Sequence, residues 1–472
     1  MTKYPLRVDV NLSLDYLGRV FNDAQILSLK IPHITGVCLD SRAILPGDLF
    51  FALKGERDGH RFVEDALEKG ARAVVVSENV TGKGISIKVK DTYAALVELA
   101  SCWRTDWGKK IIAITGSNGK TTTKEIIYSI LSAHVQTIKS PGTWNNHLGI
   151  PLTLLMIKNS HELAVLEMGM NHQGEIENYC QIAKPDIGVI TNIGHAHIGE
   201  LGSIEAIARA KAELFENLSS HGTAIVNLDD PRIEKIANQI KVKKIYVSMK
   251  PDRKADISLT KIGKLDSSRI QLNIKYGESI LNLCGPFGND YSRANLICAL
   301  GVALICGVPH EVIQTGIDQI SWPDKRYVKL TLGRGITLID DTYNANPDSM
   351  KGAIKAMCEE HPGRKIVLLG DMKELGSYSR TFHQEVGRSA FEQGVNLLFA
   401  IGEFAKDYAS GAINAGMKSK FSYVFTDRDE MLVSLMRDLQ RGDTLLVKGS
   451  RGSQMEYFSE ALKLKLPIER NR

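Results

Sequence analysis

The 472-residue chain lacks several features that would assign it to a special class. No apolar run is long enough to span a bilayer, and no signal-type apolar core follows residues 1–5. None of its seven cysteines is paired at C-x-x-C spacing, and the sequence has no short tandem repeat or low-complexity segment. The net charge of +5 is too small and too evenly spread to indicate nucleic-acid binding. We therefore expect a cytoplasmic globular protein with reduced, mostly buried thiols, no nucleic-acid partner and no membrane insertion.

The length predicts two to four domains. We place the boundaries at 1–107, 108–321 and 322–472. The first unit has a strand–turn–strand pattern at 37–51 and an apolar strand at 73–76, and the segment 103–109 is interpreted as the linker to the second unit. In the other two units, short apolar strands alternate with helices, which predicts α/β domains built on parallel sheets.

A phosphate-binding loop is the strongest motif of the chain. An apolar, β-branched strand at 110–114 leads into Gly116-Ser117-Asn118-Gly119-Lys120-Thr121, and a helical pattern follows. Backbone N–H groups of such a turn, together with the helix N-terminus, bind anions. Lys120 can reach the β- and γ-phosphates, and Thr121 can place its hydroxyl on Mg²⁺. The usual first glycine is replaced by Ile114, so a Gly-rich turn in an ordinary α/β domain is the alternative interpretation.

Polar residues follow the strands of the second unit, where an open α/β sheet binds its ligands. Glu167 ends the strand at 163–166 and is a candidate metal ligand, the alternative being a solvated loop acid. His195 and His197 follow the strand at 187–190; one of them can bind a metal as neutral imidazole, although a lone histidine is more often structural.

Lys211 stands out by its position in a helical pattern. Ser203 is a candidate N-cap for a helix over 204–218, and Lys211 falls on the apolar stripe of that helix, one heptad after Ile204. Such a lysine usually extends its ammonium group to solvent. A second hypothesis is a carbamate on Lys211, which would turn the buried cation into an anion able to bridge two Mg²⁺ ions.

The third unit carries a dense polar turn at 340–349, directly after the strand at 336–339. An N-cap with proline-assisted turn geometry explains this composition, and its Asp and Asn residues also suggest ligand contact. Arg326 stands at the entrance to the unit and could reach a γ-phosphate from a second domain.

Beyond the loop, five stretches carry a resemblance: residues 40–42 with 46–50, 55–60, 145–151, 167–169 and 341–347. Together they resemble the Mur ligases, the ATP-dependent amide ligases of bacterial peptidoglycan precursor synthesis, over nearly the whole chain. The family's loop has the same shortened Thr-Gly-x-x-Gly-Lys-Thr form, which accounts for Ile114. The resemblance implies a three-domain α/β fold: a small N-terminal domain that binds a UDP-sugar, a central P-loop ATPase domain, and a C-terminal Rossmann-like domain that binds an incoming dipeptide and part of ATP.

The resemblance also points to one branch of the family. The motif at 341–347 is typical of that branch, and the Asp-Asn-Pro-Arg motif of the diaminopimelate-adding ligase is missing. The expected enzyme is an acid–amino-acid ligase that joins D-Ala-D-Ala to UDP-N-acetylmuramoyl-tripeptide through an acyl phosphate, giving ADP and phosphate. We expect it to act as a monomer. The alternatives are a folylpolyglutamate-type or cyanophycin-type ligase, against which the 40–42 stretch argues, and a P-loop ATPase that forms no amide.

The resemblance also implies roles for individual residues. The expected ATP-binding residues are Thr115, Gly116, Ser117, Asn118, Gly119, Lys120, Thr121, Thr122, Asn295, Arg326 and Asp341. The expected catalytic residues are Lys120, Glu167, His197, Lys211 and Arg326. Mg²⁺, expected as two ions, is assigned to Thr121, Glu167, His197 and a carbamylated Lys211. The expected substrate contacts are Asp40, Ser41, Arg42, Asn145, Asn146, Asn344 and Asn346. The stretch 143–147 departs from the family pattern, with His147 where a glutamate is common, and so does Arg61 after His60.

Overall fold

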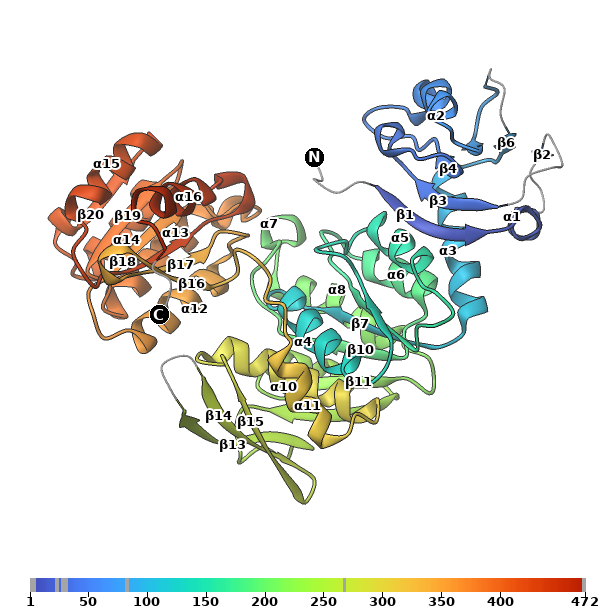
Figure 1. Ribbon diagram of the computed structural model, residues 1–472. Coiled ribbons are helices and arrows are strands. Elements are labelled where there is room, and N and C mark those ends of the chain that lie inside the picture. Colours follow the sequence, from blue (N-terminus) through green and yellow to red (C-terminus); the bar gives the residue numbers. More distant parts are fainter. Residues whose placement is uncertain (1–5, 22–24, 27–32, 81–84, 266–268, 469–472) are drawn as a thin grey trace.

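The computed structural model describes residues 6–21, 25–26, 33–80, 85–265 and 269–468. Three sheets follow one another along the chain, each with helices packed on it (Figure 1). The three-domain α/β class predicted from the sequence is confirmed.

The N-terminal sheet has the strand order β1-β3-β4-β5-β6-β2, in which the four middle strands are parallel and both edge strands are antiparallel to their neighbours. Its strands are β1 (Arg7–Leu12), β2 (Gln25–Ile26), β3 (Ile34–Cys38), β4 (Asp48–Phe51), β5 (Ala73–Val76) and β6 (Ile85–Lys88). The helices of this region are α1 (Leu14–Val20), α2 (Val63–Glu68) and α3 (Thr92–Trp107).

The interpretation of residues 103–109 as a linker is wrong for most of that segment. Helix α3 continues to Trp107 and ends at Gly108, whose left-handed backbone (φ 68°) is the C-cap. The end of α3 is fixed on the central domain, because Arg104 Nε donates to the carbonyl of Ala183 (2.7 Å) and Trp107 Nε1 donates to that of His161 (3.0 Å). The segment looks polar and irregular in sequence. Tertiary contacts of these two large side chains therefore stabilise its helical conformation.

The central sheet has nine strands in the order β15-β14-β13-β12-β11-β10-β7-β9-β8. Its parallel part is β7 (Lys110–Thr115), β8 (Thr137–Lys139), β9 (Leu163–Glu167), β10 (Ile187–Ile190), β11 (Thr223–Asn227) and β12 (Lys243–Ser248). The antiparallel extension predicted at 257–283 is formed by β13 (Ile257–Lys264), β14 (Ile270–Tyr276) and β15 (Ser279–Gly285). The α-helices are α4 (Lys120–Ser132), α5 (Gly149–Leu155), α6 (Glu175–Ala183), α7 (Ile198–Leu201), α8 (Ile204–Glu216), α9 (Pro231–Ala237), α10 (Asp290–Ile305) and α11 (His310–Asp318).

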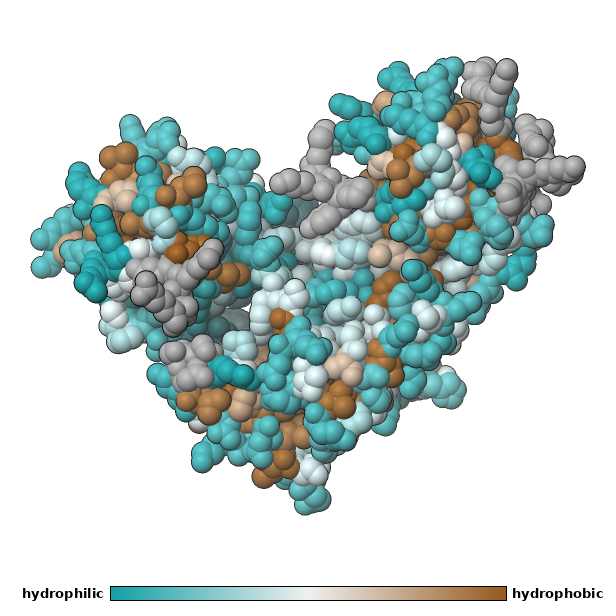
Figure 2. Space-filling view, in the orientation of Figure 1, coloured by the Kyte–Doolittle hydropathy of each residue, from teal (hydrophilic) through white to brown (hydrophobic). Residues whose placement is uncertain are grey.

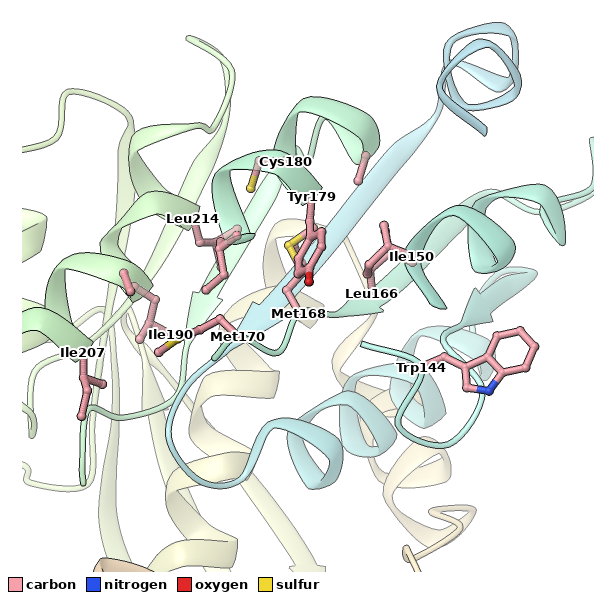
Figure 3. Packing of buried hydrophobic residues seen from close by; sticks show 14 of the residues in the cluster. Trp144, Ile150, Leu166, Met168, Met170, Tyr179, Cys180, Ile190, Ile207 and Leu214 are labelled. Carbon is pink, nitrogen blue, oxygen red and sulfur yellow. The ribbon is translucent and has the colours of Figure 1, made fainter. Parts of the chain in front are cut away.

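Packing on one face of this sheet fixes the elements that carry the site (Figure 3). Leu166 and Met168, on either side of Glu167, are both fully buried and hold that carboxylate in place. Ile207 and Leu214 of α8 are also fully buried, and Lys211 lies between them on the same helical face. Burying one such aliphatic side chain stabilises the fold by roughly 1.5–3 kcal/mol, so α8 has a strongly determined orientation.

The C-terminal sheet has the order β16-β17-β21-β18-β19-β20, and only the edge strand β16 is antiparallel to its neighbour. The strands are β16 (Val328–Leu332), β17 (Ile336–Asp341), β18 (Lys365–Gly370), β19 (Leu397–Ile401), β20 (Ser422–Phe425) and β21 (Thr444–Lys448). The α-helices are α12 (Pro347–Glu360), α13 (Ser379–Glu392), α14 (Ala405–Ala415), α15 (Arg428–Asp438) and α16 (Glu456–Lys465).

A buried histidine holds the turn that follows β18. His383 Nε2 accepts a hydrogen bond from the backbone N–H of Met372 (3.0 Å), and Nδ1 lies 2.6 Å from the carbonyl of Ser379, to which it donates. Both contacts need the neutral imidazole, because a proton on Nε2 would face the N–H of Met372. Burial accordingly lowers the pKa of His383 below its usual 6.5.

This histidine predicts an acid-sensitive fold. Because the pKa of His383 is depressed in the folded state, the unfolded state binds the extra proton first, and stability falls as the pH drops below 6.5 toward the folded-state value. One such group contributes a slope of at most about 1.4 kcal/mol per pH unit. Urea unfolding between pH 7 and pH 5 should therefore show a shallower loss of stability in His383→Gln than in the parent protein. Equal slopes would contradict the assignment.

The three domains leave a wide notch between the N-terminal and C-terminal lobes, with the central domain as its floor (Figure 2). Across the described ranges, no helix has the length and apolar character that crossing a membrane requires.

Candidate active site

The phosphate loop has the predicted strand–turn–helix geometry. It runs from the end of β7 to the start of α4, and Lys120 Nζ donates to the carbonyl of Gly116 across the turn (2.7 Å). The neighbouring strand-end residues shape it: Thr191 Oγ1 donates to the carbonyl of Asn118 (2.6 Å), and Asn192 Oδ1 accepts from the N–H of Asn118 (3.0 Å). The loop is therefore held by β10 before any nucleotide binds.

Two glycines of the loop cannot be replaced without moving it. Gly116 has φ 147°, and a Cβ there would lie 1.9 Å from Oγ1 of Thr191. Gly119 has φ 80°, and its Cβ would lie 2.4 Å from Oδ1 of Asn295 on α10. Asn295 therefore lies directly against the phosphate loop.

Glu167 lies beside the start of α4, with both carboxylate oxygens bound. Oε2 accepts from the hydroxyl of Thr121 (2.8 Å), and Oε1 accepts from the amide of Asn145 (2.8 Å). The carboxylate is almost completely buried, so the alternative of a solvated loop acid is wrong. The structure thus joins three of the predicted site residues in one cluster.

Lys124 completes this cluster and was not predicted. Its fully buried ammonium group lies 3.6 Å from Glu167 Oε2 and 3.5 Å from Glu125 Oε1, and it donates to the carbonyl of Gly142. Burial lowers the pKa of Lys124, and the two carboxylates oppose that shift. The only sequence signal was its position one turn after Lys120 on the same helix.

The two histidines both contact carboxylates of the C-terminal domain. His195 Nδ1 lies 3.1 Å from the carboxylate of Asp348, which also accepts from the N–H of His195 (2.7 Å). His197 Nδ1 lies 2.7 Å from Oε2 of Glu374, a close contact that is not aligned as a hydrogen bond. His197 lowers the pKa of Glu374.

Lys211 is buried, with 1% of its surface exposed, so the expectation that it extends to solvent is wrong. Within the described part of the chain the side-chain nitrogen of Lys211 forms neither an ion pair nor a hydrogen bond. Burial, with a smaller effect of the nearby Lys120, lowers the pKa of Lys211 well below the usual 10.5. Deprotonating a lysine at pH 7 costs about 5 kcal/mol, whereas burying an unpaired ammonium group costs far more. Burial therefore favours the neutral amine form of Lys211.

Arg326 and Asp341 lie at the entrance to the C-terminal domain. The Arg326 guanidinium stacks on the ring of Tyr343 (4.0 Å to the centroid), whose hydroxyl donates to Thr143 in the central domain (2.9 Å). Arg326 also lowers the pKa of Lys120, after the larger effect of desolvation, which places its charge near the phosphate loop. Asp341 accepts from the buried Lys448 (2.7 Å), another functional candidate that the sequence did not reveal.

The polar turn after β17 has the helix-capping role predicted for it, and it also contacts the central domain. Asn346 is the N-cap of α12 and forms a capping box with Ser349. Its amide also donates to Oδ1 of Asn118 in the phosphate loop (2.7 Å), so the turn contacts the central domain directly. Asn344 Oδ1 accepts weakly from the N–H of Arg451 (3.4 Å), and its carbonyl accepts from Lys448 (2.9 Å).

The remaining candidates lie away from this cluster or have structural partners. Asp40 accepts from both the backbone and the guanidinium group of Arg42, which lowers the pKa of Asp40, and Ser41 between them is buried in the N-terminal domain. Asn146 accepts from the N–H of Gly149 at the start of α5 (2.9 Å). These residues are thus ordered locally and not joined to the phosphate loop.

Comparison with known protein families places the chain. Family models match in chain order: "Mur ligase family, catalytic domain" at residues 33–101, "Mur ligase middle domain" at 114–303 and "Mur ligase, glutamate ligase domain" at 326–451. The chain belongs to the Mur ligase family.

The chain is similar to one branch of the family over nearly its full length. The UDP-N-acetylmuramoyl-tripeptide–D-alanyl-D-alanine ligase of Bacillus subtilis is 35% identical over 91% of this chain and 93% of its own length. The crystal structure of MurF from Acinetobacter baumannii superposes with a TM-score of 0.86 at 32% identity, covering 96% of this chain and 99% of the other. MurF from Thermotoga maritima, solved with ADP, has a TM-score of 0.81 at 27% identity over 91% of this chain and 97% of that one.

Proposed function

We propose that this protein joins D-Ala-D-Ala to UDP-N-acetylmuramoyl-tripeptide at the expense of ATP, in the cytoplasm, as a step of peptidoglycan precursor synthesis. One observation carries the proposal: the turn at 341–347, which has the sequence typical of that branch of the family, lies against the phosphate loop through Asn346 and Asn118. The relatives that carry this function in their names match nearly the full length of the chain.

The three domains divide the substrates among them in this proposal. Residues 1–107 bind the UDP-sugar through the region of Asp40, Ser41 and Arg42, residues 108–321 bind ATP, and residues 322–472 bind the dipeptide and part of ATP. A peptide carboxylate is a poor electrophile, so its oxygen first attacks the γ-phosphorus of ATP and ADP leaves. The amino group of D-Ala-D-Ala then attacks the acyl phosphate, an amide forms and phosphate leaves.

The chain's own charges serve the first step. Lys120 and Arg326 reach the phosphate region from two domains and can neutralise charge on the transferring phosphoryl group. In this proposal Asn295 and Asp341 contact the adenine and ribose of ATP, and Asn145, Asn146 and Asn344 contact the substrates. Closure of the C-terminal domain over the loop keeps water from the acyl phosphate.

Mg²⁺ fits the cluster around Glu167. Oγ1 of Thr121 and Oε2 of Glu167 are 2.8 Å apart at the start of α4. Each of these two oxygens keeps a lone pair for a cation. Thr121, Glu167, His197 and Lys211 would hold two ions together with phosphate oxygens and water. When bound, Mg²⁺ supplies charge neutralisation for phosphoryl transfer.

Carbamylation of Lys211 fits its environment as well. A carbamate forms when a neutral amine attacks carbon dioxide and loses a proton, and the depressed pKa of Lys211 provides that neutral amine. The modified side chain offers two oxygens, the ligand type that Mg²⁺ prefers.

The experiment that tests the proposal measures phosphate release with each substrate omitted in turn. ATP turnover should require both UDP-N-acetylmuramoyl-tripeptide and D-Ala-D-Ala. Turnover without either substrate would identify a P-loop ATPase that forms no amide.

A further inference from the structure

We propose that Glu374, on the C-terminal domain, is a positioning residue that holds His197 of the central domain in the orientation needed for metal binding. Metal affinity thereby depends on closure of the C-terminal domain. The inference rests on the proposed function, in which His197 is a metal ligand.

The contact between the two side chains is the first observation. Oε2 of Glu374 lies 2.7 Å from Nδ1 of His197, which leaves Nε2 as the nitrogen free to coordinate a cation. Histidines that bind metals commonly place their second ring nitrogen against a carboxylate, which fixes the ring and raises its basicity.

The backbone around Glu374 is the second observation. Glu374 has φ 64°, a left-handed conformation that is costly for a side chain with a Cβ and that clusters at functional sites. Its carbonyl accepts from the N–H of Gly199, at the start of α7, two residues after His197 (2.9 Å). A Cβ on Gly199 would lie 2.6 Å from the backbone nitrogen of Gly376 and 2.7 Å from the Glu374 carbonyl, so the two backbones touch.

The turn that carries Glu374 is held from inside its own domain. Met372 N–H donates to His383, and Lys373 N–H donates to Ser450 Oγ (2.8 Å). Glu374 therefore moves with the C-terminal domain and not as a loose loop. His197, which also has a left-handed backbone (φ 63°), receives its partner only when the two domains meet.

The test measures the dissociation constant of Mn²⁺, used alone as a paramagnetic probe with ADP present, by electron paramagnetic resonance. Glu374→Gln should weaken Mn²⁺ binding by about 10–100-fold, the usual effect of losing such a partner, and Glu374→Asp should lie between that variant and the parent. Glu392→Gln, at the exposed end of α13 in the same domain, is the matched control and should not change the constant. Glu374→Gly, which relieves the positive φ, should lose affinity equally while melting no lower than the parent protein.

A double-mutant cycle separates this inference from the proposed function. In a His197→Ala background, Glu374→Gln should add almost no further loss, because Glu374 acts through His197. Two outcomes would refute the positioning role and leave the metal site in place. In the first, His197→Ala weakens Mn²⁺ binding and Glu374→Gln does not. In the second, the losses of the two single variants add in full in the double variant. If His197→Ala itself leaves Mn²⁺ binding unchanged, both the ligand assignment and the positioning role are wrong. A higher KM for D-Ala-D-Ala with unchanged Mn²⁺ affinity would show instead that Glu374 binds the incoming ammonium group.

Discussion

Lys120→Ala should reduce ligation by a factor of about 10²–10³ while the protein stays folded. In the proposed mechanism Lys120 is the preorganised positive charge of the phosphate loop, so its loss removes charge stabilisation where the phosphoryl group transfers. Among the residues that the structure describes, its side chain makes one hydrogen bond, to Gly116, so little stability depends on it. The measurement is the rate of phosphate release at saturating substrates, together with a thermal melt.

Lys124→Ala is the informative comparison. Lys124 is fully buried beside Glu167 and Glu125, so its removal leaves two buried carboxylates less well compensated and should lower the melting temperature as well as the rate. Near-parent turnover in folded Lys120→Ala would refute the assignment of the phosphate loop.

Lys211→Ala should be nearly inactive, and a short carboxylic acid such as acetate should partly restore its activity. The buried amine would be replaced by a small cavity at the proposed metal site, and an added carboxylate could supply the missing oxygens. Lys211→Arg should also fail, because a guanidinium group stays cationic and cannot be carbamylated. Activity with and without added acid is the measurement.

A direct view of the modification comes from carbon-13 NMR after equilibration with labelled bicarbonate. The parent protein should show a carbamate signal that Lys211→Met lacks. Lys211→Met replaces a buried amine by an apolar side chain of similar length, so it should fold normally and serve as the control. Full activity in Lys211→Arg, or no carbamate signal in active protein, would contradict the proposal.

The sequence predicted best what is local and periodic. The strands that end at Glu167 and at Asp341 and the N-cap at Ser203 are visible in short windows, because burial on both faces of a parallel sheet requires unbroken apolar runs. The sequence placed Lys211 on an apolar stripe, but the usual expectation for such a lysine, an ammonium group extended to solvent, was wrong. The helical state of residues 103–107 was missed, because it depends on contacts of Arg104 and Trp107 with another domain.

The sequence missed Lys124 and Lys448 inside single domains, and it also missed contacts built between domains. Glu374 lies in a polar turn after β18 that looks like any other strand end, and only the structure brings it to His197. The sequence pattern around Asp348 is typical of the first turn of a helix, and only the structure shows that Asp348 also contacts His195. A pattern in one sequence records what a residue's neighbours along the chain require, and these contacts join residues about 150 or more positions apart.

The measurement that tests the central claim most directly is amine-dependent phosphate release with UDP-N-acetylmuramoyl-tripeptide and ATP held constant. Our account predicts that D-Ala-D-Ala supports turnover better than L-Ala, D-Glu or a free diamino acid by roughly 10²-fold or more, with one amide formed for each phosphate released. A preference for a single amino acid would assign the protein to another ligase of the family and contradict the account.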